Sequence, residues 1–197
     1  ANPLSPVAPG DIAGVTHIFV THGHFDHLGD TVELARSNGA TVVSNPEICA
    51  YCAEKGLPTH GMHFGGPRAF PFGRVRMVSA LHGSDIREGG RTIPGGQSCG
   101  FVFELEGKRV YHAGDTALIA DMSLLQGVDL ALLPIGGYYT MDADDALRAV
   151  ELIRPAAVVP MHYNANPQIQ ADPEAFVSRL PASVRGVVLR PGASLTL

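Results

Sequence analysis

The sequence lacks the features of a disulfide-stabilised, membrane-spanning or nucleic-acid-binding protein. Its three cysteines cannot form a complete disulfide set, which favours a reducing, cytoplasmic environment. Uncharged apolar stretches are only as long as a strand, so no membrane span is predicted. The 14 basic and 19 acidic residues give a net charge of -5 without a basic run. Nucleic acid is therefore not expected as a partner.

The remaining composition is that of a globular protein. Hydrophobic residues make up 45% of the chain and charged residues 17%, with no biased tract or linker. We therefore predict one domain over residues 1–197. Cys49 and Cys52 form a lone C-x-x-C, and its spacing favours one packed helix face over a metal or redox site.

Hydrophobic periodicity predicts a layered α/β architecture. Short apolar, β-branched runs predict strands at residues 15–20, 41–44, 75–81, 100–105, 109–113, 129–135, 156–161 and 187–189. Apolar residues at helical spacing, with capping residues at the ends, predict helices at 28–37, 46–55, 142–153 and 172–180. A hairpin turn is predicted at residues 106–108.

The stretch THGHFDHLGD, residues 21–30, concentrates metal-binding side chains. Imidazole and carboxylate are ligands of divalent transition metals. His22 and His24 are two residues apart and point the same way in an extended chain, whereas Asp26 and His27 begin a helix. Four ligands from one segment would crowd a single tetrahedral cation, so we predict two.

Other candidate ligands follow predicted strands further along the chain. His82, Asp115 and His162 each come just after a strand, where sites of open α/β sheets collect. His82 can complete the ligand set of the first cation and His162 that of the second, while Asp115 can bridge the two cations with its two oxygens. The remaining histidines are interpreted differently: His17 as a hydrogen-bonded core residue, and His60 and His63 as solvated loop residues.

These residues carry a family resemblance. THGHFDHLGD resembles the H-x-H-x-D-H signature of the metallo-β-lactamase superfamily, and ALHGS, YHAGDT and PMHYN resemble its later motifs, in order. LLPIGGYYTM, residues 132–141, is similar to a segment of the branch that contains the UPF0173 metal-dependent hydrolases, the ascorbate-6-phosphate lactonases and the N-acyl-phosphatidylethanolamine phospholipases D. The resemblance runs from about Asn2 to Phe176, and UPF0173 is the group most similar to the chain.

The resemblance implies a four-layer αββα sandwich and a ligand assignment that agrees with the one from spacing. His22, His24 and His82 would hold one cation, and Asp26, His27 and His162 the other, with Asp115 between them. Family members usually begin with two or three strands ahead of the position of Asn2, so the chain is expected to lack its N-terminal strands. That loss would expose an unpaired edge, which invites a homo-oligomer.

The expected activity is hydrolysis of a small-molecule phosphodiester, lactone or related ester. Water between two divalent cations becomes acidic enough to supply hydroxide near neutral pH. Zinc is favoured, with manganese or iron as alternatives. Asp26 or His112 is the candidate proton shuttle, although plain packing competes for His112. The candidate substrate-binding residues are Gly136, Gly137, Tyr138, Tyr139, Tyr163 and Asn164.

Two other functions use the same residues. A di-iron redox protein would normally carry an extra carboxylate in the first motif and a flavin domain, and neither is seen. A non-catalytic binding module would have little reason to keep all seven ligand positions filled. RNA processing is disfavoured by the acidic net charge.

Overall fold

The computed structural model describes residues 5–197, so Asn2 and Pro3, where the resemblance begins, lie outside the described residues. The chain divides into two compact units that are interleaved in sequence. Unit 1 comprises the residues up to His63, residues 83–98 and residues 191–193. Unit 2 comprises residues 64–82, 99–190 and 194–197. A single hydrolase domain stays a prediction, and each unit is described by itself.

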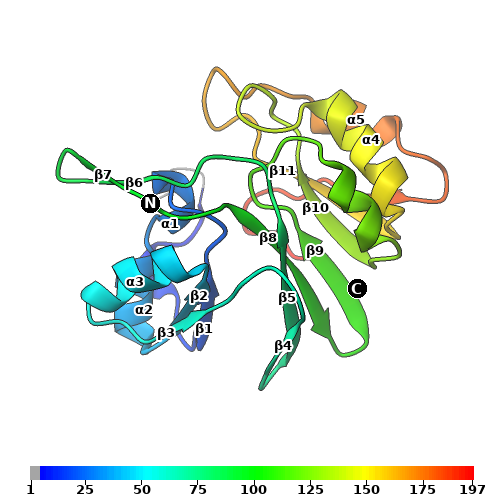
Figure 1. Cartoon of the computed structure of the whole chain (residues 1–197). Helices are drawn as coiled ribbons and strands as arrows, with labels where there is room; N and C mark the ends of the chain where they lie inside the picture. Colours follow the sequence, from blue (N-terminus) through cyan, green and yellow to red (C-terminus); the bar gives the residue numbers. More distant parts are fainter. Residues whose placement is uncertain (1–4) are drawn as a thin grey trace. The chain divides into compact units, whose positions relative to one another are not determined.

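Unit 1 is built on a three-stranded parallel sheet. β2 (Thr41–Ser44) lies between β1 (His17–Phe19) and β3 (Thr59–Gly61). Around it the chain forms η1 (Pro9–Asp11), α1 (Phe25–Leu28), α2 (Thr31–Asn38), α3 (Pro46–Glu54) and the hairpin of β6 (Ile86–Glu88) and β7 (Arg91–Ile93) (Figure 1). Buried side chains such as Val42, Ile48 and Cys52 fill its core.

Local sequence determines where the helices of unit 1 begin and end. The helix expected from residue 28 begins instead at Thr31, because Gly29, at φ 37°, ends the separate helix α1. α2 ends at Gly39, which adopts the left-handed conformation (φ 65°) that favours glycine. On α3, Cys49 and Cys52 are buried, and desolvation raises the pKa of the Cys52 thiol to about 11. Both thiols therefore pack as apolar groups.

Unit 2 is built on a seven-stranded mixed sheet. Its strands are β4 (Arg68–Phe70), β5 (Gly73–Ser79), β8 (Cys99–Leu105), β9 (Lys108–His112), β10 (Leu130–Pro134), β11 (Ala157–Met161) and β12 (Arg185–Gly186). They are ordered β12-β11-β10-β9-β8-β5-β4. The pairs from β9 to β12 are parallel, and the pairs from β4 to β9 are antiparallel. The predicted hairpin joins β8 to β9 through Glu106 and Gly107, which have φ of 49° and 79°.

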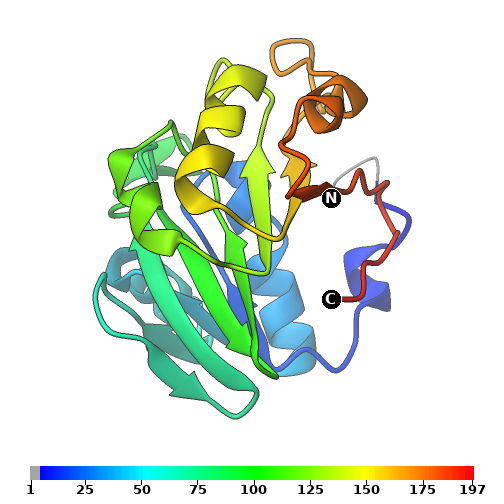
Figure 2. The same cartoon turned by 90° about the vertical axis from the view of Figure 1, so that its right-hand side faces the viewer.

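Helices cover one face of this sheet. α4 (Ala143–Ile153) and α5 (Pro173–Ser178) lie on the same side of β9, β10 and β11 (Figures 1 and 2). The side chain of Asp142 accepts a hydrogen bond from the Asp145 amide and so caps α4. The buried side chains of Tyr111, Leu133, Ile153 and Phe176 belong to one core cluster between helices and sheet.

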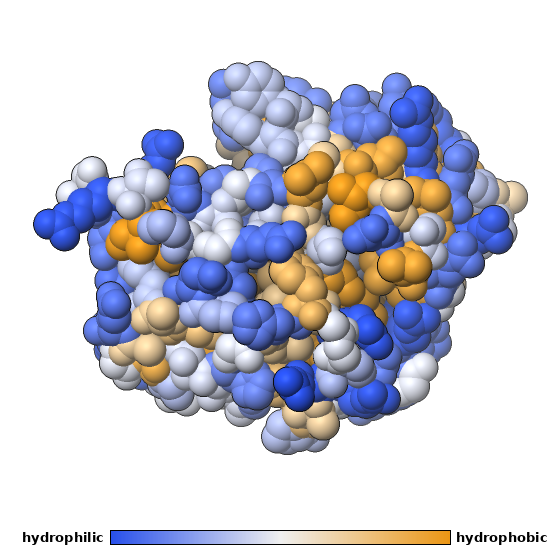
Figure 3. All heavy atoms as spheres, in the orientation of Figure 1, coloured by the Kyte–Doolittle hydropathy of each residue, from blue (hydrophilic) through white to orange (hydrophobic). Residues whose placement is uncertain are grey.

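Part of this face is apolar and hollowed. Figure 3 shows apolar side chains gathered over η2 (Ala120–Leu125) and the strands beside it. A groove of about 410 Å³ lies there, lined by Phe64, Met77, Val78, Val102, Met122 and Leu124 among others.

The α/β class expected from the sequence is confirmed, whereas several short elements were not expected. β3, β4, β6 and β7 have three residues each, too few for a hydrophobic period to show. The last strand was predicted at residues 187–189 but lies at Arg185–Gly186, although the Val187 amide still donates to the Val158 carbonyl. Within residues 5–197, every helix is too short or too polar to cross a lipid bilayer.

Candidate metal centre

The first candidate ligands follow β1 in unit 1. Val20 is buried, its amide donates to the Val43 carbonyl, and its own carbonyl accepts from the Ser44 hydroxyl at 2.7 Å. The chain therefore leaves the sheet at a fixed point, directly before Thr21 and His22, which are both buried. His24 caps the amino end of α1, and Asp26 and His27 lie within that helix.

The ring nitrogens of this segment are spaced as ligands of one cation. His22 Nε2 and His24 Nδ1 are 3.1 Å apart. Two nitrogens bound tetrahedrally at Zn–N distances of about 2.0–2.1 Å would be roughly 3.3 Å apart. The ring centroids of His22 and His27 are 4.0 Å apart, and His27 Nε2 lies 3.5 Å from the Asp26 carboxylate. Unit 1 therefore gathers all four of its predicted ligands.

Thr21 orients two of these imidazoles. Its hydroxyl oxygen lies 3.1 Å from His22 Nδ1 and 3.4 Å from His27 Nδ1. If both Nδ1–H groups donate to this oxygen, both Nε2 atoms carry the lone pair that a cation needs. The donor set and its tautomers therefore fit a divalent metal.

A buried hydrogen-bond network supports the turn between His22 and His24. The Gly23 amide donates to the Ser84 hydroxyl at 3.1 Å, and that hydroxyl donates to the Gly95 carbonyl at 2.8 Å. Asn45 Nδ2 also donates to the Gly95 carbonyl at 2.7 Å. A Cβ on Gly23 would lie 2.4 Å from the Ser84 carbonyl oxygen, so the close approach requires glycine.

Unit 2 brings its candidate ligands together at one edge of its sheet. β9, β10 and β11 are parallel, and β5 runs in the same direction because two antiparallel pairings separate it from β9. The carboxyl ends of these strands therefore share an edge. His82 follows β5, Asp115 follows β9 and His162 follows β11.

Asp115 lies between the two histidines of unit 2. Its Oδ2 is 3.6 Å from His82 Nε2 and 3.2 Å from His162 Nε2, and its side chain is 4% exposed. The sequence-based expectation was a bridge through two oxygens, whereas here one oxygen faces both rings. His162 has a φ of 55°, a conformation that costs a non-glycine residue on the order of 1 kcal/mol. Such strain is typical of functional sites.

The remaining histidines differ in their surroundings. His112 is half-buried, and its Nδ1 accepts a hydrogen bond from the Gly114 amide at 3.1 Å. His112 therefore supports the turn that presents Asp115, and its acid/base role stays a prediction. His17 was expected in the core but is only half-buried, and it contacts the Thr16 hydroxyl at 3.0 Å. His60 and His63 are exposed as expected, although His60 lies in β3 rather than in a loop.

The candidate substrate-binding residues lie beyond the ends of β10 and β11. Gly136 and Gly137 are buried, whereas the side chains of Tyr138 and Tyr139 are 75% and 45% exposed. Tyr163 packs against the core, and burial, followed by the charge of Glu174, raises the pKa of its phenol.

Asn164 has a different local role. Its side chain exchanges two hydrogen bonds with the Ala171 backbone, which favours a loop-holding function. Its contact with substrate stays a prediction.

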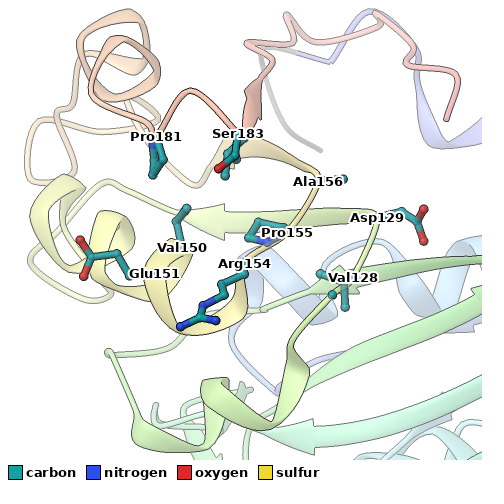
Figure 4. Close-up of a pocket in the computed structure, with 11 residues that line it drawn as sticks. Val128, Asp129, Val150, Glu151, Arg154, Pro155, Ala156, Pro181 and Ser183 are labelled. Atoms are coloured by element: carbon teal, nitrogen blue, oxygen red, sulfur yellow. The ribbon is translucent and has the colours of Figure 1, made fainter.

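A shallow cavity of about 570 Å³ in unit 2 lies at the opposite edge of the sheet. Its lining comes from the starts of β10 and β11 and from the end of α4, and includes Asp129, Val150, Arg154 and Pro155 (Figure 4). None of the predicted ligands lines it. It is therefore separate from the candidate metal centre.

Sequence reasoning missed the residues that support the ligands. Thr21 directly precedes His22, and Ser84 is the second residue after His82, so both stand inside motifs that had been identified. Asn45 was not identified. The sequence feature that could have identified it is the asparagine directly before Pro46, because an asparagine followed by a proline is typical of the start of a helix.

Comparisons with known proteins show the family and the fold of the chain. Residues 1–163 match the model of a beta-lactamase superfamily domain. A UPF0173 metal-dependent hydrolase of Heliobacterium modesticaldum is 48% identical over 100% of this chain and 86% of that protein. A UPF0173 metal-dependent hydrolase of Alkaliphilus metalliredigens is 50% identical over 87% of this chain and 78% of that protein. The structure of Igni18, a metallo hydrolase of the archaeon Ignicoccus hospitalis, is 37% identical with a TM-score of 0.90, covering 98% of this chain and 85% of its own.

Proposed function

Because the chain belongs to the UPF0173 family of metal-dependent hydrolases within the metallo-β-lactamase superfamily, we propose that it hydrolyses a small phosphodiester, lactone or related ester with a pair of divalent cations. The protein is a metal-dependent hydrolase with the metallo-β-lactamase fold, as expected from its sequence. The substrate, the number of cations and the ligand assignment belong to the proposal.

The observation that carries the proposal is that each unit assembles its own ligand set with ligand-like spacing. Unit 1 holds His22 Nε2 and His24 Nδ1 3.1 Å apart. Unit 2 holds one oxygen of Asp115 within 3.6 Å of two imidazole nitrogens. Buried imidazole and carboxylate groups at these separations are difficult to explain by packing alone.

Chain connectivity supports the union of the two sets. The chain passes from unit 2 to unit 1 between His82 and Gly83. A Cβ on Gly83 would lie 3.4 Å from His24 Nε2, and Ser84 accepts a hydrogen bond from Gly23. Gly83, the residue bonded to His82, therefore lies beside His24 within unit 1.

In the proposed site, His22, His24 and His82 hold one cation, and Asp26, His27 and His162 hold the other, with Asp115 between them. When bound, the cations lower the pKa of water and stabilise the negative charge that develops on the substrate. Thr21 keeps the proton of His22 on Nδ1. Asp26, whose side chain is 44% exposed, is the more accessible candidate for passing a proton to the leaving group.

Metal content and hydrolysis together test the proposal. The full chain should bind two zinc or manganese ions, measured by atomic emission, and should cleave p-nitrophenyl phosphodiesters or a lactone panel. Asp115→Asn should lose at least one ion and most of the activity, whereas Asp121→Asn, at an exposed residue of η2, should change neither. A fully active protein with a single ion per chain would overturn the two-cation site, and a loaded protein that cleaves neither class would overturn the activity.

A further inference from the structure

Large apolar side chains are exposed directly beside the candidate ligands. Phe25, between His24 and Asp26, is 86% exposed. Leu81, directly before His82, is 62% exposed, and Tyr138 is 75% exposed. Single exposed apolar residues are ordinary, but these coincide with the ligand positions of both units. Their exposure is therefore more readily explained by a ligand than by the core.

In unit 2, hydrogen bonds to Thr116, the residue after Asp115, hold the backbone of Leu81 and the turn that carries Tyr138. Thr116, which is fully buried, accepts from the Leu81 amide at 3.0 Å, and its carbonyl accepts from the Met141 amide at 2.9 Å. The Gly137 amide donates to the Met141 carbonyl at 3.0 Å, which closes the turn that carries Tyr138. Leu81 and this turn are therefore both held by the residue that follows Asp115.

The tyrosine pair is rigid and strained. Tyr138 has a φ of 58°, which disfavours any residue with a side chain. Its ring meets that of Tyr139 edge to face, with centroids 4.5 Å apart, and the Tyr139 hydroxyl donates to Gln168 at 2.7 Å. An ordered aromatic side chain that stays exposed offers contact area at little entropic cost.

Cationic side chains are missing from the same segments. Residues 21–30, 80–85, 113–117, 136–141 and 161–164 contain no lysine or arginine. A substrate with several negative charges, such as a nucleotide, would require such groups beyond the cations. The part of the substrate away from the scissile bond is therefore not expected to be anionic.

From the exposed apolar groups and the missing cationic ones, we propose that the substrate carries an alkyl or aryl group that contacts Leu81 and Tyr138 of unit 2. The inference rests on the proposed function, because it places the scissile bond at the cations. It narrows the substrate class to apolar esters or phosphodiesters.

A chain-length series tests this inference. The zinc-loaded full chain is assayed with p-nitrophenyl methyl, butyl and octyl phosphates and with p-nitrophenyl acetate, butyrate and octanoate. Full burial of one methylene is worth up to about fourfold in kcat/KM. We expect kcat/KM in the cleaved class to rise at least about tenfold from the shortest to the longest member.

Substitutions at the proposed contact residues test where the dependence on chain length arises. The double variant Leu81→Ser and Tyr138→Ser should keep its metal content and lose most of the dependence on chain length. Leu124→Ser is the matched control, because Leu124 is 80% exposed on η2, away from the ligand segments, and it should keep the dependence.

Calorimetry of methyl- and octylphosphonate binding gives a readout independent of turnover. We expect tighter octylphosphonate binding with a negative heat-capacity change. Failure to hydrolyse both of these series and the lactone panel would overturn the proposed function, and the phosphonate binding series would still test the apolar contact. Hydrolysis without chain-length dependence, or a double variant that keeps the dependence, would overturn this inference and leave the proposed function standing.

Discussion

Replacing Ser84 by alanine should weaken metal binding more than it weakens the fold. The Ser84 hydroxyl accepts from the Gly23 amide and donates to the Gly95 carbonyl, and the residue is 6% exposed. Alanine leaves the Gly23 amide without this acceptor, at a cost of about 1–3 kcal/mol. If the loop relaxes in the absence of metal, this cost appears only when His22 and His24 must converge on a cation. Zinc affinity should then fall by roughly 5- to 150-fold.

Competition with a chromophoric zinc chelator measures the affinity, and thermal unfolding of the metal-free protein measures the fold. Ser37→Ala removes an exposed hydroxyl of α2 that donates to the Leu34 carbonyl and accepts from Asn38 Nδ2, and it should leave both nearly unchanged. Cobalt substitution adds a spectroscopic check, because a displaced His22 or His24 alters the ligand field. A Ser84→Ala protein with unchanged zinc affinity and a lower melting temperature would refute the positioning role.

Three further substitutions test the packing and electrostatics. Gly23→Ala should destabilise the protein by about 1–3 kcal/mol or more, because its Cβ would lie 2.4 Å from a carbonyl oxygen, whereas Gly10→Ala, with nothing within 4 Å, should be nearly neutral. Equal free energies of unfolding in urea for these two variants would contradict this expectation. Tyr111→Phe should raise the free energy of unfolding by about 1 kcal/mol, since its buried hydroxyl has no hydrogen-bond partner within residues 5–197; a loss of stability would argue against it. The hydrogen bond from the Arg109 backbone amide, and then the side chain of Lys108, lower the pKa of the Asp129 carboxyl. The stability that this carboxylate contributes is therefore present above the ordinary carboxyl pKa and is lost as the pH falls through the lowered value. Asp129→Asn should therefore destabilise the protein at neutral pH and converge with the wild type as the pH falls below the lowered pKa of Asp129; a stability difference that persists in acid would contradict this.

The long elements of the fold were predictable because their sequence periods are unambiguous. α4 was expected at residues 142–153 and lies at Ala143–Ile153, and β10 and β11 lie within one residue of the predicted bounds. The three-residue strands β3, β4, β6 and β7 were not predictable, because they depend on pairing with other segments rather than on a local hydrophobic period. The hairpin of β6 and β7 is an example: Glu88 is held by Tyr51 of α3 and by Lys55, the residue that follows this helix, and no local pattern shows these contacts.

The positions of the candidate ligands were predictable for a different reason. They follow strand ends, and strand direction alone brings Asp115 and His162 to one edge of the sheet. Their support was not predictable, because it joins residues that are far apart in sequence. Asn45 reaches the Gly95 carbonyl across 50 positions, and Ser84 reaches Gly23 across 61. The resulting hydrogen bonds depend on the folded backbone rather than on any repeated spacing.

The division of the ligands between two units explains why this support matters. In the proposed function each cation takes ligands from both units, so its binding free energy is gained only when the two sets are held together. The shortest route between the sets follows the chain from His82 through Gly83 to Ser84 and then crosses the hydrogen bond from the Gly23 amide to the Ser84 hydroxyl, which limits the entropy lost in joining them. Ser84 fixes the unit 1 end of this route to the turn between His22 and His24. The Ser84 hydroxyl, which is not a ligand in the proposed site, can therefore affect the affinity with which both ligand sets bind the metal.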